Sequence, residues 1–173
     1  VMQQFSLPFQ ISRSHGKLWF ETRLKTSTIA DTQFDWFAGF GDQMTISATV
    51  PITATAGSMA DENWVGFHHL ATDGDYVDAA YKADGVTAVY SVSDAQVLVA
   101  DTYVKLGMKF DPDTFVLTWY GNGIALGTKT IPSAAGTDFP NDVALGLLFA
   151  TCNAAAASPL LTIDWVRAAQ LVP

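Results

Sequence analysis

The chain has 173 residues, of which 49% are hydrophobic, so it has the length of one large domain and enough apolar surface for a two-layer core. Its formal charge of −8 comes from 15 Asp and 2 Glu against nine Lys and Arg spread singly along the sequence, which predicts no basic stripe and no nucleic-acid partner. The single cysteine excludes an intrachain disulfide, and no apolar run approaches the roughly 20 residues of a membrane span, so no membrane partner is expected.

The first clear strand is predicted over residues 17–25, where apolar and polar side chains alternate. This alternation is typical of an antiparallel strand with one buried face. Trp19 falls on the polar face together with Glu21 and Arg23, so we expect its ring to be exposed unless a partner covers it.

Further strands are predicted over residues 35–40, 44–50, 64–70, 76–82, 86–92, 103–110, 115–120, 143–151 and 159–171. Turn-forming residues separate them at intervals of roughly 8–12 residues, as in an all-β sandwich. Ser93 and Asp94 are one of these turn signals. In the segment from residue 35 onward, Gly39 and Gly41 indicate either a backbone that a neighbouring segment approaches closely or a β-bulge before the next turn.

Two turns in the second half of the chain predict hairpins. Residues 111–113 form an Asp-Pro-Asp turn between two strands, and Asn122 with Gly123 opens a second hairpin. These elements together predict an all-β fold, an antiparallel two-sheet jelly-roll β-sandwich. We expect it to occupy residues 16–173, with residues 1–15 as an N-terminal arm or edge strand.

Three segments carry a family resemblance: residues 16–25, residues 104–123 and residues 161–167. In order and spacing they resemble the concanavalin A-like, lectin or laminin-G type, jelly-roll domains of tailed-phage virion structural proteins. The resemblance implies a non-enzymatic capsid decoration or cement protein that binds the major capsid protein and its own copies. It also implies assembly in the host bacterial cytoplasm and a location in the virion.

For that role, an interface is expected at the apolar N-terminal segment and around the first strand. The candidate interface residues are Phe5, Leu7, Phe9, Ile11 and Trp19. Chain termini are readily donated to neighbouring molecules, which favours the N-terminal residues.

The alternative hypothesis is a carbohydrate-binding, lectin-like module of a phage fibre or of a secreted bacterial protein, with a glycan as partner. A flat aromatic ring can stack on a sugar ring, and Trp64 and Tyr76 are the candidate ligand-binding residues. Core packing is the competing interpretation of such rings.

A calcium site is the metal hypothesis, and no other cofactor is expected. Asp73, Asp75 and Asp78 surround a glycine-containing turn and could offer oxygen ligands to a hard cation. Solvated acidic turns are the competing interpretation. His68 and His69 are adjacent in a predicted strand, so they point to opposite faces and cannot both bind one ion.

Catalytic motifs are not evident. The paired carboxylates of a glycosidase need to share a strand face, and the only glutamates are Glu21, beside Arg23, and Glu62 in a predicted loop. Cys152 lies in an apolar run and is predicted to be a buried core residue. We therefore predict that the chain is not an enzyme.

Overall fold

The computed structural model describes residues 2–4, 8–30, 34–42, 52, 59–131, 138–153 and 158–171, with the backbone alone described for 2–4. All regular structure in these residues is β-strand. The strands are β1 (Met2–Gln4), β2 (Phe9–Gln10), β3 (Leu18–Thr26), β4 (Phe34–Gly41), β5 (Trp64–His69), β6 (Tyr76–Lys82), β7 (Val89–Val97), β8 (Val104–Asp111), β9 (Val116–Gly121), β10 (Ile124–Thr130), β11 (Ala144–Asn153) and β12 (Leu161–Gln170). This part of the chain holds no helix with the length and apolar character of a membrane crossing.

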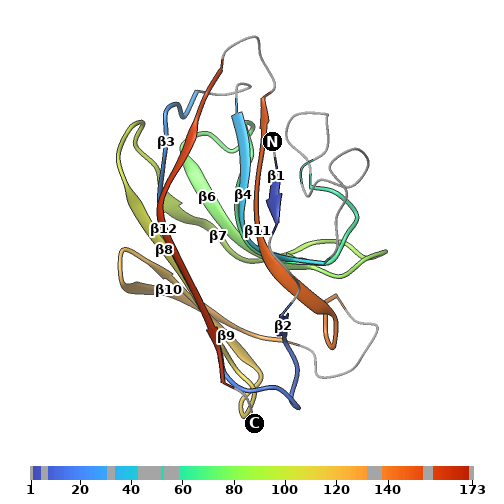
Figure 1. Cartoon of the computed structure of the whole chain (residues 1–173). Coiled ribbons are helices and arrows are strands. Elements are labelled where there is room, and N and C mark those ends of the chain that lie inside the picture. Colours follow the sequence, from blue (N-terminus) through green and yellow to red (C-terminus); the bar gives the residue numbers. More distant parts are fainter. Residues whose placement is uncertain are drawn as a thin grey trace.

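The strands form two antiparallel sheets that lie face to face (Figure 1). The seven-stranded sheet has the order β1-β11-β4-β5-β6-β7, with β2 also paired to β11, and the five-stranded sheet has the order β10-β9-β8-β3-β12. The predicted antiparallel β-sandwich is therefore confirmed.

The main core lies between the two sheets and is rich in aromatic rings. The inward face of β3 is buried as its alternation predicts, and the Phe20 ring packs edge-on against Phe40 of the opposite sheet at 5.4 Å between centroids. Phe67 and Trp119 make a second edge-to-face contact at 5.2 Å. Such ring pairs contribute about 0.5–1.5 kcal/mol beyond the area they bury, so they tie the two sheets together.

The seven-stranded sheet is also buried on part of its outer face. There Phe37 and Trp64 form a second cluster that includes Ile52, and a short β-bridge joins Ile52 to Met59 over this cluster. Both faces of β4 and β5 are consequently buried along their whole length.

Some boundaries differ from the sequence expectation. The sequence predicts the hairpin that opens the exposed strand β10 but not the bounds of that strand, because the strand has few large apolar residues and no alternation. The turn expected at Ser93 and Asp94 lies inside β7, where Asp94 has a φ of +50° and the register with β6 shifts, so the signal marks a β-bulge. The strand expected over 44–50 lies outside the described residues.

The hairpin expected at Asn122 and Gly123 is present between β9 and β10. Both residues have positive φ, +52° and +83°, as a two-residue type I′ turn requires. The 111–113 turn likewise joins the antiparallel strands β8 and β9.

The N-terminal strands pair with β11 of the same chain. The Gln170 side chain clamps this segment to the other sheet. The backbone N–H of Gln10 donates to Gln170 Oε1 at 3.1 Å, and Gln170 Nε2 donates to the backbone carbonyl of Gln10 at 2.6 Å. The described part of residues 1–15 therefore lies along the sandwich as edge strands.

Candidate functional site

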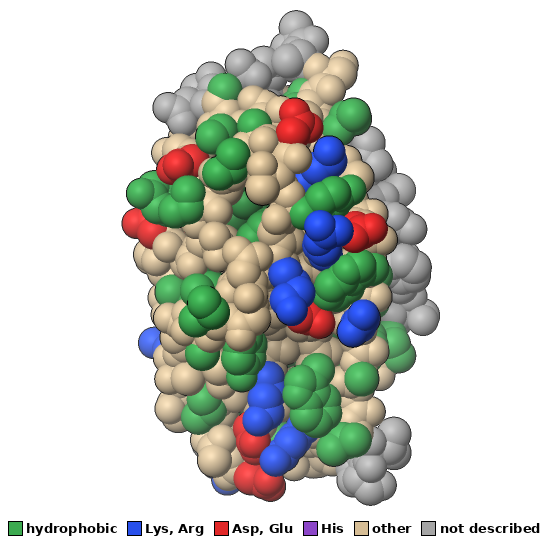
Figure 2. All heavy atoms as spheres, turned by 90° about the vertical axis from the view of Figure 1, so that its left-hand side faces the viewer, with side chains coloured by type: hydrophobic (Ala, Val, Ile, Leu, Met, Phe, Trp, Pro, Cys, Tyr) green, Lys and Arg blue, Asp and Glu red, His purple; other side chains and the backbone are tan. Residues whose placement is uncertain are grey.

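The outer face of the five-stranded sheet gathers basic side chains that are far apart in the sequence. Strand register places Lys109 opposite Trp19, and Arg167 opposite Glu21. Six of the nine basic residues lie on this face: Lys17, Arg23, Lys25, Lys105, Lys109 and Arg167. Figure 2 shows Lys and Arg side chains interleaved with hydrophobic ones here. Antiparallel pairing brings these single cations from three strands together, an arrangement that the sequence did not predict.

Most of these cations are paired. The outward face of β3 alone contributes three contacts: Arg23 to Asp164 at 2.5 Å, Lys25 to Asp101 at 3.8 Å, and Glu21 to Lys105 at 3.2 Å. Within the described residues Arg167 forms no ion pair, and its guanidinium lies 4.6 Å from the centre of the Trp165 ring. Arg167 is thus a free cationic donor on this face.

A groove of about 410 Å³ crosses this face beside Trp19, whose side chain is 38% exposed. Its lining includes Trp19, Glu21, Gly107, Lys109, Tyr120 and Arg167. Gly107 pairs with Glu21 on one side and Tyr120 on the other, so the side chain missing at this position opens the floor of the groove. A Cβ atom there would lie 3.4 Å from the Phe20 carbonyl oxygen and 3.6 Å from Tyr120 Cβ.

The groove has the properties of a ligand site. Its volume falls within the roughly 300–1,000 Å³ usual for small-ligand pockets, and it combines aromatic walls with a few polar groups. Trp19 offers a ring face, Glu21 accepts hydrogen bonds, and Lys109 and Arg167 donate them.

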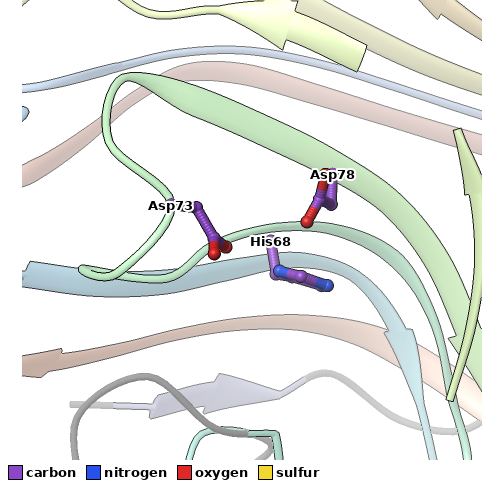
Figure 3. Close-up of side chains that lie close together, drawn as sticks. All are labelled: His68, Asp73 and Asp78. Carbon is purple, nitrogen blue, oxygen red and sulfur yellow. The ribbon is translucent and has the colours of Figure 1, made fainter. Parts of the chain in front are cut away.

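A second cluster lies at the other sheet, where β5 turns into β6. His68 of β5, Asp73 of the connecting loop and Asp78 of β6 place one ligand-type atom each within 4.8 Å of one another (Figure 3). The backbone N–H of Asp94, at the β7 bulge, donates to Asp78 Oδ1 at 2.8 Å. The loop and the bulge together therefore position the two carboxylates beside the imidazole.

Burial dominates the electrostatics of this cluster. It lowers the pKa of His68 to about 3, with a smaller contribution from the neighbouring charge of His69, so the imidazole is neutral at ordinary pH. Burial also raises the pKa of Asp73 and of Asp78.

The structure changes the predicted metal set. Asp73 and Asp78 do come together, but Asp75 is not part of the group, and His68 takes its place. The two histidines point to opposite faces as predicted: His69 lies in a hydrogen bond with the Tyr76 carbonyl at 2.8 Å, while His68 faces the carboxylates.

The predicted ligand-binding and interface residues fall into different environments. Trp64 is fully buried, so the idea that its ring stacks on a sugar is wrong, because Ile52 and Met59 pack in the same cluster. Tyr76 is 37% exposed at the start of β6.

Among the interface candidates, Ile11 is fully buried in the main core and is corrected to a core residue. Phe9 is partly buried, with its ring 5.0 Å from that of Phe40. Trp19 is exposed, and the side chains of Phe5 and Leu7 lie outside the described residues.

No protein-family model and no curated protein matches the sequence. Solved structures with the same fold include the carbohydrate recognition domain of Emp46p in its potassium-bound form, with a TM-score of 0.62 and 13% identity over 96% of this chain and 77% of that one. A carbohydrate esterase of the Shiga toxin-encoding bacteriophage phi24B has a TM-score of 0.58 and 14% identity over 99% and 75%. The β-glucanase of Bacillus licheniformis has a TM-score of 0.54 and 16% identity over 96% and 67%.

These similarities establish a concanavalin A-like jelly-roll fold, as the sequence resemblance implied. They also overturn the prediction that the chain is not an enzyme. That prediction treated the fold as a scaffold for adhesion and assembly, yet a β-glucanase and a carbohydrate esterase share it. The jelly roll therefore gives no ground for excluding catalysis.

Sequence reasoning missed the groove because Gly107, Lys109 and Arg167 are unremarkable within their own segments. Only the pairing of β8 and β12 with β3 places them around Trp19. One signal in the sequence did indicate this face: Trp19 is an aromatic residue among the charged outward residues of β3.

Proposed function

We propose that this protein binds a carbohydrate in the groove on the outer face of the five-stranded sheet. The observation that carries the proposal is the exposed ring of Trp19 beside a glycine floor and Arg167, which forms no ion pair within the described residues. Aromatic rings with one free face stack on the apolar face of a sugar, and the polar groups around them fix its orientation.

Arg167 suggests which glycans bind best. Because it forms no ion pair within the described residues, it can donate two parallel hydrogen bonds to a carboxylate or sulfate group without breaking an existing contact. Lys109, opposite Trp19, adds a second positive charge. A glycan with acidic substituents is therefore the preferred ligand class.

The fold relatives support this choice of ligand. They include a carbohydrate recognition domain, a carbohydrate esterase and a β-glucanase. At 13–16% identity they share the fold with this chain, so the argument for the groove depends on its own residues.

A place on a bacteriophage particle is the second proposal, and the phage esterase, which aligns with 99% of this chain, supports it. In that setting the chain would be a virion decoration or fibre domain that binds the major capsid protein and further copies of itself. Electron microscopy of purified particles would test it, and particles lacking ordered density for this chain would count against it.

The binding proposal is tested by screening acidic and neutral glycans on an array and measuring the best ligand by calorimetry. Trp19→Ala should weaken binding at least about tenfold, because a stacked aromatic anchor commonly contributes more than 1 kcal/mol. Tyr103→Ala is the matched control, since Tyr103 lies on the same face under the Arg23 guanidinium but does not line the groove. Equal binding by wild type and Trp19→Ala would remove the groove from consideration.

A further inference from the structure

His68 is a buried polar side chain. It is fully buried, and within the described residues neither Nδ1 nor Nε2 has a hydrogen-bond partner. Leaving a buried donor or acceptor unpaired costs about 1–3 kcal/mol, so native proteins usually satisfy such groups. The buried Oδ2 atom of Asp73, one of the two carboxylates beside this ring, also has no partner.

The surrounding charge is uncompensated. All nine lysines and arginines lie in the described part of the chain, and none of them forms an ion pair with Asp73 or Asp78. The buried Asp78 and the half-buried Asp73 beside an imidazole make a site that favours a cation, because burying negative charge without a compensating positive charge is costly.

We infer that His68, Asp73 and Asp78 bind a divalent transition metal of the zinc class. One imidazole nitrogen and two carboxylate oxygens suit such a metal, whereas calcium takes six to eight oxygen ligands. The calcium set expected from the sequence needed Asp75, which the structure leaves out of the cluster.

The geometry fits this metal class. The three donor atoms lie within 4.8 Å of one another, and neighbouring donors of a tetrahedral zinc ion bonded at about 2.1 Å are about 3.4 Å apart, so the side chains close on an ion by moving inward by about 1 Å. The N–H of Asp94 already holds Asp78 Oδ1, which orients that carboxylate in the way outer groups orient metal ligands. Three protein ligands leave a further position for water or a ligand oxygen.

The site is compact in the sequence as well as in space. Its ligands come from the end of β5, the following loop and β6, and the exposed ring of Tyr90 packs edge-on over His68 at 5.5 Å between centroids. Tyr90 covers one side of the imidazole, while Asp73 is half-buried at the edge of the cluster.

The test is a titration of chelator-treated full-length protein with ZnCl₂ by calorimetry, with CaCl₂ in a parallel titration and CoCl₂ as a spectroscopic probe. We expect one zinc ion per chain and a cobalt absorption band typical of mixed nitrogen and oxygen ligands. His68→Asn and Asp78→Asn should each weaken zinc binding at least about tenfold, since losing even an outer-shell partner costs 10–100-fold. Circular dichroism checks that both variants fold.

Asp75→Asn is the matched control, because it removes a carboxylate from the same loop but not from the cluster, and it should bind zinc like the wild type. The inference is overturned if wild type binds no zinc at 100-fold excess, if His68→Asn and Asp78→Asn bind it as tightly as wild type, or if calcium binds in its place with affinity that Asp75→Asn reduces. Glycan binding measured without metal is a separate readout, so failure of the metal site leaves the groove proposal standing.

Discussion

Gly39 of β4 and Gly66 of the neighbouring strand β5 are directly opposite each other in the strand register, and the Phe37 ring lies over both. A Cβ atom on Gly39 would come within 2.6 Å of Gly66 Cα, and one on Gly66 would come within 2.9 Å of the tip of the Phe37 ring. The glycine pair therefore allows the outer cluster around Trp64 to pack directly on the sheet.

Replacing either glycine should destabilise the fold. Gly66→Ala is expected to lower the free energy of unfolding by about 1–3 kcal/mol, the usual cost of overpacking, because backbone atoms of β4 cannot move aside. Chemical denaturation measures the change. Gly107→Ala is the control: its Cβ would make contacts no closer than 3.4 Å, and stability within about 0.5 kcal/mol of wild type is expected. A Gly66→Ala protein as stable as Gly107→Ala would contradict the close approach.

Filling the groove should abolish glycan binding without unfolding the protein. Gly107→Leu places a branched side chain between Glu21 and Tyr120, where the ligand would lie. We expect at least about a tenfold loss of affinity in calorimetry, since the blocked groove excludes the ring that stacks on Trp19. Gly107→Ala should retain most of the binding. If Gly107→Leu bound glycan normally while remaining folded, the ligand would have to bind elsewhere.

The hydroxyl of Tyr81 is buried and has no hydrogen-bond partner among the residues that the structure describes. Burial, and next the negative charge of Asp138, raise the pKa of Tyr81 to about 12, so the folded state keeps its proton while the unfolded chain loses it above about pH 10. Stability is therefore lost as pH rises from about 10 to 12, by roughly 1.4 kcal/mol per pH unit from this group.

Tyr81→Phe removes both the unpaired hydroxyl and this titration. Thermal unfolding at pH 7 should show unchanged or higher stability, because no hydrogen bond is lost. Between pH 10 and 12 the variant should lose less stability than wild type. A clearly destabilised variant at pH 7 would mean that the hydroxyl has a partner.

The Gln10 and Gln170 clamp should control the attachment of β2. Gln170→Ala removes both hydrogen bonds to Gln10 and a longer one to the Gly16 carbonyl, and a loss of about 1–2 kcal/mol is expected in the local opening free energy. Amide hydrogen exchange at Gln10 reports it directly. Thr162→Ala, an exposed change on the same strand, should leave that exchange rate unaltered. Unchanged protection of Gln10 in Gln170→Ala would show that β2 is held by its pairing with β11 alone.

Local patterns in the sequence predicted much of the fold. The alternation over residues 17–25 gave the correct inward face of β3, and the Asn122 and Gly123 pair gave the correct hairpin, because both signals depend only on neighbouring residues. The close backbone approach expected at Gly39 is also confirmed.

The remaining features depend on contacts between distant segments. The sequence offered Trp64 as an exposed ring, because it does not show that Ile52 and Met59 pack in the same cluster. β10 is a strand mainly because it pairs with β9. At the β5–β6 turn, the carboxylates Asp73 and Asp78 were found from their spacing. His68 was not assigned to them, because only the register of β5 with β6 brings its ring to the same point.

The ladder between β3 and β12 has a kinetic consequence. It joins residues such as Arg23 and Asp164, which are 141 positions apart, and the clamp joins residues 160 apart. Chains with such distant pairings fold in about milliseconds to seconds, well behind helical bundles of similar stability. During synthesis, the backbone groups of β3 that pair with β12 stay unpaired until β12 emerges from the ribosome. Chaperone contact or misassociation should therefore concentrate at this unpaired edge of β3.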